Sequence, residues 1–191
     1  MKTIKENIMS ELVIKNSKFI TYLFKISSPN EINLYLEKLK EEYPDATHHC
    51  YAWILDKDMK SSDDGEPGGT AGLPMLNVLL KNELTNILAV TIRYFGGIKL
   101  GASGLVRAYT KSLTSTFEKV QVVNLIQAYE IELTINYDQT KNLDYLLKDQ
   151  LIIKKEYGDT ITYLIKIPTT FYPKLSAYNP KIISETTIEE S

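Results

Sequence analysis

Residues 86–117, NILAVTIRYFGGIKLGASGLVRAYTKSLTSTF, decide how the rest of the chain is organised. The stretch begins with an almost unbroken apolar run rich in β-branched residues, which predicts a strand buried on both faces. A short loop follows that contains four glycines, Gly96, Gly97, Gly101 and Gly104. A four-residue repeat then predicts a helix with one apolar stripe, made of Leu105, Tyr109, Leu113 and Phe117. A strand, a glycine loop and a helix in this order aim backbone N–H groups at an anion.

Positive charge is concentrated in the same stretch. Residues 85–117 contain no aspartate or glutamate, and their four bases are Arg93, Lys99, Arg107 and Lys111. Both arginines of the chain lie here, and a planar guanidinium suits bidentate phosphate or carboxylate recognition. Arg107 and Lys111 are four residues apart and therefore share a helix face. We predict a basic strand–loop–helix face that binds an extended polyanion, formed by these four bases with Gly96, Gly97, Gly101 and Ser103.

A plainer interpretation of this stretch stays open. The two arginines would hold loops in place by donating to backbone carbonyl groups, and the glycines would only permit turns, because glycine loops alone are weak evidence for a binding site.

Length and composition set the outer limits. The 191 residues are enough for two compact domains. The net charge of −2 argues against a protein that coats DNA by bulk charge, so nucleic-acid binding must come from a local patch. The single cysteine, Cys50, excludes an internal disulfide and fits a reducing cytosol. No apolar run is long enough for a signal peptide or a membrane span, so we predict a cytoplasmic protein without a membrane partner.

The first sixty residues predict ordinary elements. Residues 11–26 suggest a hairpin around Asn16-Ser17, and Ser28-Pro29 begins a helix that ends before Pro44. Residues 46–55, ATHHCYAWIL, predict a strand on which neighbouring side chains point to opposite faces. His48 and His49 therefore diverge and cannot both bind one metal ion. His48 with Cys50 could supply two ligands or a thiolate–imidazole pair, but a packed strand is favoured, and we predict no metal and no cofactor.

Residues 56–74 predict a long loop with an excess of acidic residues. Asp63, Asp64 and Glu66 would bind a divalent cation or serve acid–base chemistry in one interpretation. In the other, which we favour, the aspartates cap turns or pair with Arg93 or Arg107. A short helix over residues 74–80 then leads into the central strand.

Three blocks of sequence, DATHHCYAW, SSDDGEPGGTAGLP and VTIRYFGGIKLGASGLVRAY, resemble the signature blocks of the YigZ/IMPACT family in order and spacing. His49 stands where many relatives carry asparagine, and Gly68 where many carry serine. The resemblance implies no Walker-type phosphate loop and no established enzymatic chemistry. It also implies a link to translation, because the eukaryotic members compete for a scaffold that activates the amino-acid-starvation kinase. The bacterial members resemble a two-domain fragment of elongation factor G.

The rest of the chain predicts a second domain. Residues 120–125 are a plausible junction, which gives domains 1–124 and 125–191. The second part has a β-α-β-β-α-β pattern, with Asp138 as a helix N-cap and a hairpin turn at Gly158-Asp159. We predict an α+β protein: a β-α-β-α domain of the ribosomal-protein second-domain type, followed by a ferredoxin-like domain. The second part has a net charge of −3, so a uniform RNA-binding surface over both is not expected.

Two classes of function follow from these observations. In the first, the protein is a non-enzymatic, translation-associated regulator that binds RNA, the ribosome or a translation-regulatory protein through the basic face, with no catalytic residue. Tyr94 or Phe95 would stack a base. The alternative is packing, and because a strand buries alternate sides we expect at least one of the two in the core. In the second, it is a hydrolase-like enzyme acting on a phosphorylated or peptide-like substrate. Its cleft would be lined by the acidic loop, the two arginines and His48.

Overall fold

The computed structural model describes residues 1–190 and shows a mixed α+β protein of two units. The first unit is Met1–Val123 and the second is Asn124–Ser191, so the division falls within the junction of residues 120–125 expected from the sequence, one residue before the expected boundary. Within residues 1–190 no helix is long and apolar enough to cross a membrane. Each unit has its own apolar core and is described separately below.

The first unit is built on an antiparallel sheet with the strand order β2-β3-β6-β4-β5. Its strands, with the short strand that precedes them, are β1 (Lys2–Ile4), β2 (Ile8–Ile14), β3 (Ser17–Lys25), β4 (His48–Leu55), β5 (Asp58–Ser62) and β6 (Ile87–Tyr94). The central strand β6 comes from the apolar run quoted above, and every residue from 87 to 93 is buried. The prediction of a strand covered on both faces is confirmed.

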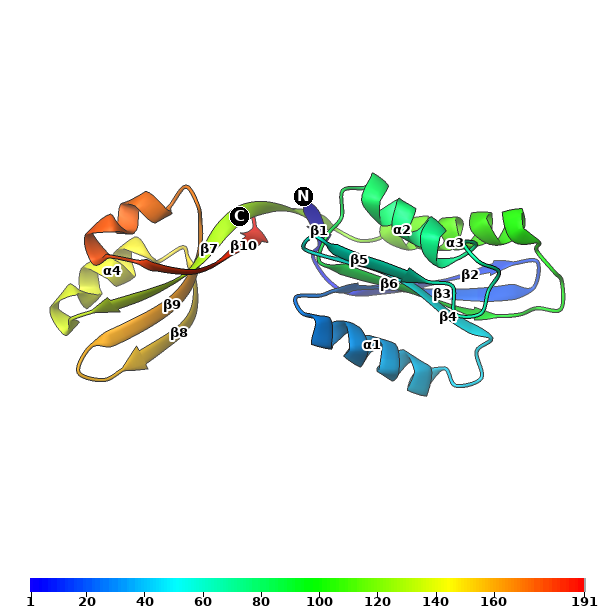
Figure 1. Cartoon of the computed structure of the whole chain (residues 1–191), viewed down its shortest axis with the longest axis horizontal. Helices are drawn as coiled ribbons and strands as arrows, with labels where there is room; N and C mark the ends of the chain where they lie inside the picture. Colours follow the sequence, from blue (N-terminus) through cyan, green and yellow to red (C-terminus); the bar gives the residue numbers. More distant parts are fainter. Residues whose placement is uncertain (191) are drawn as a thin grey trace. The chain divides into compact units, whose positions relative to one another are not determined.

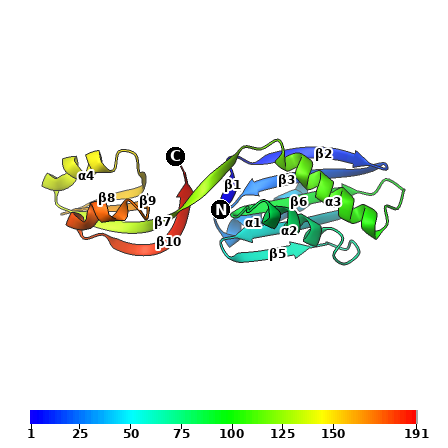
Figure 2. The same cartoon turned by 90° about the horizontal axis from the view of Figure 1, so that it is seen from above.

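Helices cover both faces of this sheet (Figure 1). α1 (Pro29–Glu42) lies on one face, and α2 (Gly72–Lys81) and α3 (Ala102–Phe117) lie on the other. Figure 2 shows α2 and α3 running side by side over the strands. Leu88, Val90 and Ile92 of β6 pack toward α1, whereas Ile87 and Ala89 pack toward α2 and α3. Alternate side chains thus enter two cores, which explains why the run is apolar at every position.

Local signals set the ends of several elements. Lys15 and Asn16 have positive φ angles in the two-residue turn between β2 and β3, the conformation that a tight hairpin needs. The side chain of Ser28 accepts a hydrogen bond from the Glu31 backbone N–H and caps α1. Gly96 passes so close to this hairpin that a Cβ atom there would lie 2.0 Å from the Asn16 carbonyl carbon. Packing against the hairpin therefore requires a glycine at position 96.

The prediction of a long loop over residues 56–74 is wrong for its first part, because Asp58–Ser62 forms the strand β5. This strand lies at the edge of the sheet, and its residues are exposed or half-buried. Its polar sequence carries no alternation of apolar residues, so the sequence pattern does not reveal this strand, which pairs with β4 through its backbone. The expected helix over 74–80 is confirmed as α2.

The second unit orders its strands β10-β7-β9-β8, and all three pairs are antiparallel. Its elements are β7 (Val122–Ile135), η1 (Tyr137–Gln139), α4 (Thr140–Leu146), β8 (Leu151–Tyr157), β9 (Ile161–Pro168), η2 (Tyr172–Tyr178) and β10 (Lys181–Glu189). The predicted N-cap at Asp138 is wrong. Asn136 caps this segment instead, in a reciprocal arrangement with Gln139, and Asp138 lies in the first turn.

Candidate functional site

Arg93 occupies a buried position near the end of β6. It pairs across the sheet with Phe19 of β3 and His48 of β4, and only 4% of its surface is exposed. Its guanidinium donates to Glu66 Oε1 at 2.6 Å and to Ser17 Oγ at 3.3 Å. The prediction that Arg93 lies on an open basic face is therefore wrong. Because side chains alternate along β6, Arg93 points to the α2–α3 side of the sheet, where its charge is buried.

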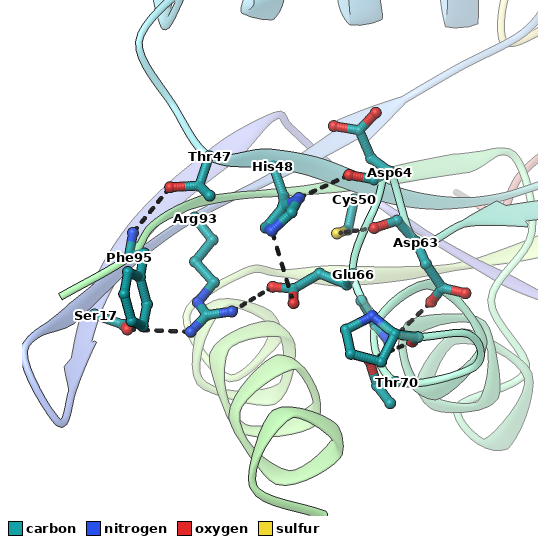
Figure 3. Close-up of polar contacts among 12 residues, drawn as sticks. Ser17, Thr47, His48, Cys50, Asp63, Asp64, Glu66, Thr70, Arg93 and Phe95 are labelled. Carbon is teal, nitrogen blue, oxygen red and sulfur yellow. Dashed lines mark hydrogen bonds and ion pairs between the residues drawn. The ribbon is translucent and has the colours of Figure 1, made fainter. Parts of the chain in front are cut away.

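Glu66 is the partner that encloses Arg93, and it is buried as well. Its Oε1 atom also accepts a hydrogen bond from the Tyr109 hydroxyl at 2.8 Å. Its Oε2 atom lies 3.8 Å from His48 Nε2 (Figure 3). A buried carboxylate is tolerated only when charged and polar partners surround it, and here three side chains do so. The sequence suggested a pairing between the acidic loop and an arginine, but with the aspartates in the role that Glu66 takes.

The orientation of His48 follows from its second nitrogen. Nδ1 lies 2.7 Å from the backbone carbonyl oxygen of Asp64. Because a carbonyl can only accept, Nδ1 carries the proton and Nε2 is the nitrogen that faces Glu66. His49 points to the other side of β4, as expected from the alternation, and burial lowers the pKa of its imidazole.

The two aspartates of the loop hold the backbone in place. Asp63 accepts hydrogen bonds from the N–H groups of Gly69, Ala71 and Gly72 and so caps the start of α2. Burial opposes the charge of Asp63, but these three bonds outweigh it and keep its pKa below the usual value. Asp64 accepts from the His49 backbone N–H at 2.6 Å. The favoured interpretation of these residues as turn caps is confirmed.

Cys50 does not form a thiolate–imidazole pair. The residue is fully buried, and its Sγ atom lies 3.0 Å from the Asp63 carbonyl oxygen and 3.3 Å from the Tyr109 hydroxyl oxygen. Burial raises the pKa of the Cys50 thiol to about 12, so the nucleophilic thiolate is not populated near neutral pH. Burial likewise raises the pKa of Tyr109. Among residues 1–190, no group of three or more His, Cys, Asp or Glu side chains could hold a metal ion.

Three of the four predicted bases are exposed. Lys99 lies in the glycine loop, and Arg107 and Lys111 lie on the solvent side of α3. None of them makes an ion pair within the part of the chain that the structure describes. We call Lys99, Arg107 and Lys111 the basic face.

The glycine loop leads into a helix whose first turn has no side-chain cap. Gly101 adopts a positive φ angle immediately before α3, and Ser103 is exposed in the first turn. Gly97 also has a positive φ angle and is exposed, whereas Gly96 is placed by packing. The free N–H groups of the first turn carry the positive end of the helix dipole.

A cavity of about 360 Å³ opens between the start of α3, the end of β6 and the loop that carries Glu66. Its lining includes Arg93, Glu66 and His48, the apolar side chains of Pro67, Leu100 and Leu105, and residues of the glycine loop. Arg107, Asp63 and Asp64 do not line it. The expected cleft between the acidic loop and both arginines is therefore not formed as predicted.

The two aromatic residues that follow Arg93 differ in their surroundings. Tyr94 is partly buried against the core on the α1 side, whereas Phe95 is 47% exposed and lines the cavity. The expectation that at least one of them packs in the core is confirmed by Tyr94. The contribution of Tyr109 to the site was not predicted, because this residue was assigned only to the apolar stripe of the helix.

Comparison with known proteins places this geometry in a family. Residues 15–117 match the model of the Impact N-terminal domain. The chain is 38% identical to the IMPACT family member YvyE of Bacillus subtilis (strain 168) over 166 residues, which cover 84% of this chain and 76% of that protein. It is 34% identical to the IMPACT family member YigZ of Escherichia coli (strain K12) over 171 residues, covering 86% and 84% respectively. A crystal structure described as that of a hypothetical protein matches with a TM-score of 0.70 and 31% identity, over 96% of this chain and 97% of the other.

Proposed function

The chain belongs to the IMPACT family, and we propose on this basis that it is a non-enzymatic, translation-associated regulator that binds RNA through its basic face. The carrying observation is the exposure of Lys99, Arg107 and Lys111 in a segment without an acidic residue. Unpaired cations on one side of a protein of net charge −2 form a local patch that suits a polyanion.

An exposed aromatic ring adds to this support. Phe95 is nearly half exposed, and the Arg93 guanidinium lies 5.6 Å from the centre of its ring on the buried side. Single-stranded RNA is commonly bound by cations that follow its backbone together with aromatic rings on which bases stack. Arg93 takes no part in phosphate contacts in this proposal, because Glu66 and Ser17 already occupy it.

The domain types expected from the resemblance belong to the same proposal. We assign the second unit to the ferredoxin-like class, which its strand order β10-β7-β9-β8 and its two helical segments between strands support. We assign the first unit to the ribosomal-protein second-domain type. Both assignments agree with a role beside the translation machinery.

Fluorescence anisotropy with a labelled single-stranded RNA at several salt concentrations tests the proposal. Three phosphate contacts predict a slope of log K against log salt of about −2. The double variant Arg107→Glu, Lys111→Glu should weaken binding roughly tenfold or more, because two attractive contacts become repulsive.

The matched control reverses the charge of two lysines on the opposite side of the same sheet. Lys38→Glu with Lys40→Glu makes the same change in net charge on α1, whose lysines at these positions are exposed. Equal losses in the two double variants, or affinity that does not change with salt, would refute binding through the basic face.

A further inference from the structure

The cavity beside α3 has the size and lining of a small-ligand pocket. Its volume of about 360 Å³ lies at the lower end of the range for such sites, which is enough for one nucleobase. Pro67, Leu100 and Leu105 give it apolar walls, and a few polar groups of Glu66, His48 and Arg93 gather at one part of the lining. Pockets of this kind use the apolar walls for affinity and the fixed polar groups for selectivity.

The polar part of the lining is preorganised around Glu66. The Glu66 side chain is 3% exposed, and both hydrogen bonds to it, from Arg93 and Tyr109, end on Oε1. Among residues 1–190 no hydrogen bond reaches Oε2, and His48 Nε2 lies 3.8 Å from it. The carboxylate is therefore held rigidly by one oxygen and offers the other as a free acceptor. Among residues 1–190, Oε2 is not one of the fully buried side-chain atoms that lack a partner, so it is reached from the cavity, and a ligand that supplies an N–H group can donate to it.

His48 lies beside this acceptor. Because Nδ1 donates to the Asp64 carbonyl oxygen, Nε2 is the ring nitrogen that faces Glu66 Oε2, at 3.8 Å. An N–H group of a ligand in the cavity can donate to Glu66 Oε2, whereas a lone carbonyl oxygen in the same place would face a carboxylate.

The rest of the lining suits the remainder of a nucleotide. The exposed ring of Phe95 offers a stacking surface for a base. Lys99 and the uncapped first turn of α3 at Ala102 lie on the same cavity and attract a phosphate. The pocket therefore combines an acceptor for an amino group, a ring surface and a cationic rim.

We propose that this pocket takes one base of a bound RNA strand and selects adenine or cytosine, which carry an amino group at the position where uracil carries a carbonyl oxygen, over uracil. Glu66 Oε2 accepts an N–H bond of the amino group. Uracil presents a carbonyl oxygen at that position, which the carboxylate repels. The inference rests on the RNA-binding function proposed above and adds a base preference to it.

Competition with labelled oligonucleotides tests the inference. The probes are U₈, the same strand with one central adenosine or cytidine, and the same strand with one central purine riboside, which lacks the amino group. We expect the adenosine and cytidine strands to bind about tenfold more tightly than U₈. The purine riboside strand should lose this advantage, and it tests the amino group without altering the protein.

The variant Glu66→Gln tests the acceptor from the protein side. A glutamine amide can donate to the carbonyl oxygen of uracil, so the ratio of adenosine to uridine affinity should fall toward one. Glu37→Gln, at an exposed position of α1, is the matched control and should keep the ratio. A fall of this affinity ratio toward one is a change that a merely destabilised protein would not produce, because its affinities for both strands would then decrease together.

The outcomes separate the two proposals. Equal, salt-sensitive binding of U₈ and the adenosine strand by the unaltered protein would overturn the base preference and leave RNA binding intact. Equal affinity of the adenosine and purine riboside strands would do the same. No binding of any strand would overturn the proposed function itself.

Discussion

Replacing Arg93 by methionine should lower the free energy of unfolding of the first unit more than any substitution on the basic face. Methionine is an apolar side chain of similar length, so the substitution fills much of the same space but removes the charge that faces Glu66 at 2.6 Å. Both side chains are at least nine-tenths buried, so the remaining carboxylate would lie in a low-dielectric region without its cationic partner. Removing one member of a buried ion pair costs about 3–5 kcal/mol of the free energy of unfolding.

The assay is urea unfolding followed by the emission of Trp53, the only tryptophan, which lies on β4 in the first unit. Arg107→Met is the control, since Arg107 is exposed and makes no ion pair within residues 1–190, and it should change stability by no more than about 0.5 kcal/mol. Adding Glu66→Gln to Arg93→Met removes the stranded charge and should recover about 1–2 kcal/mol, and with the Glu66→Gln single variant it completes the cycle that measures the coupling.

A small effect would refute this reasoning. If Arg93→Met loses less than about 1 kcal/mol, the pair behaves as an exposed one. The guanidinium would then be free for a ligand. The same result would restore Arg93 to the basic face.

Three further predictions concern stability and reactivity. Gly96→Ala should cost about 2 kcal/mol or more in a urea titration, because the new methyl group meets the Asn16 backbone. Gly97→Ala should cost less, because it has open space around it and only the strain of its positive φ angle opposes the change. Asp63→Asn should weaken the protein at neutral pH and flatten its acid limb: the folded-state pKa of Asp63 is depressed, so its contribution is present above the usual aspartate value and is lost as the pH falls through the folded value. Cys50 should react with a thiol reagent only at the rate of unfolding, and rapid modification of the native protein at pH 8 would contradict its burial.

The parts of the fold that could be predicted are those with a strong local signal. The apolar run of β6, the four-residue stripe of α3 and the Ser28 cap of α1 each involve neighbours in the sequence. β5 could not be predicted in the same way, because an exposed edge strand leaves no apolar pattern. The cap of η1 was misplaced by two residues because Asn136 and Asp138 are both good capping residues, and the choice depends on where β7 ends.

The site divides along the same line. Exposure of Arg107 and Lys111 follows from their spacing on an amphipathic helix, so the sequence was sufficient for them. Burial of Arg93 depends on Glu66, which lies 27 residues away, and on the Tyr109 hydroxyl of a third segment. Charge counting identifies which residues are cations, but only the packing of strand, loop and helix decides which cation is neutralised.

The uneven placement of charge has a consequence for purification. A protein with a sequence pI of about 5.8 is expected to elute early from a cation exchanger at neutral pH. Lys99, Arg107 and Lys111, however, stand in a segment without acidic residues and can engage a sulfated polysaccharide resin locally. Retention on heparin despite negative net charge, and earlier elution of charge-reversed variants, would therefore rank the strength of this surface during routine chromatography, before any nucleic acid is prepared.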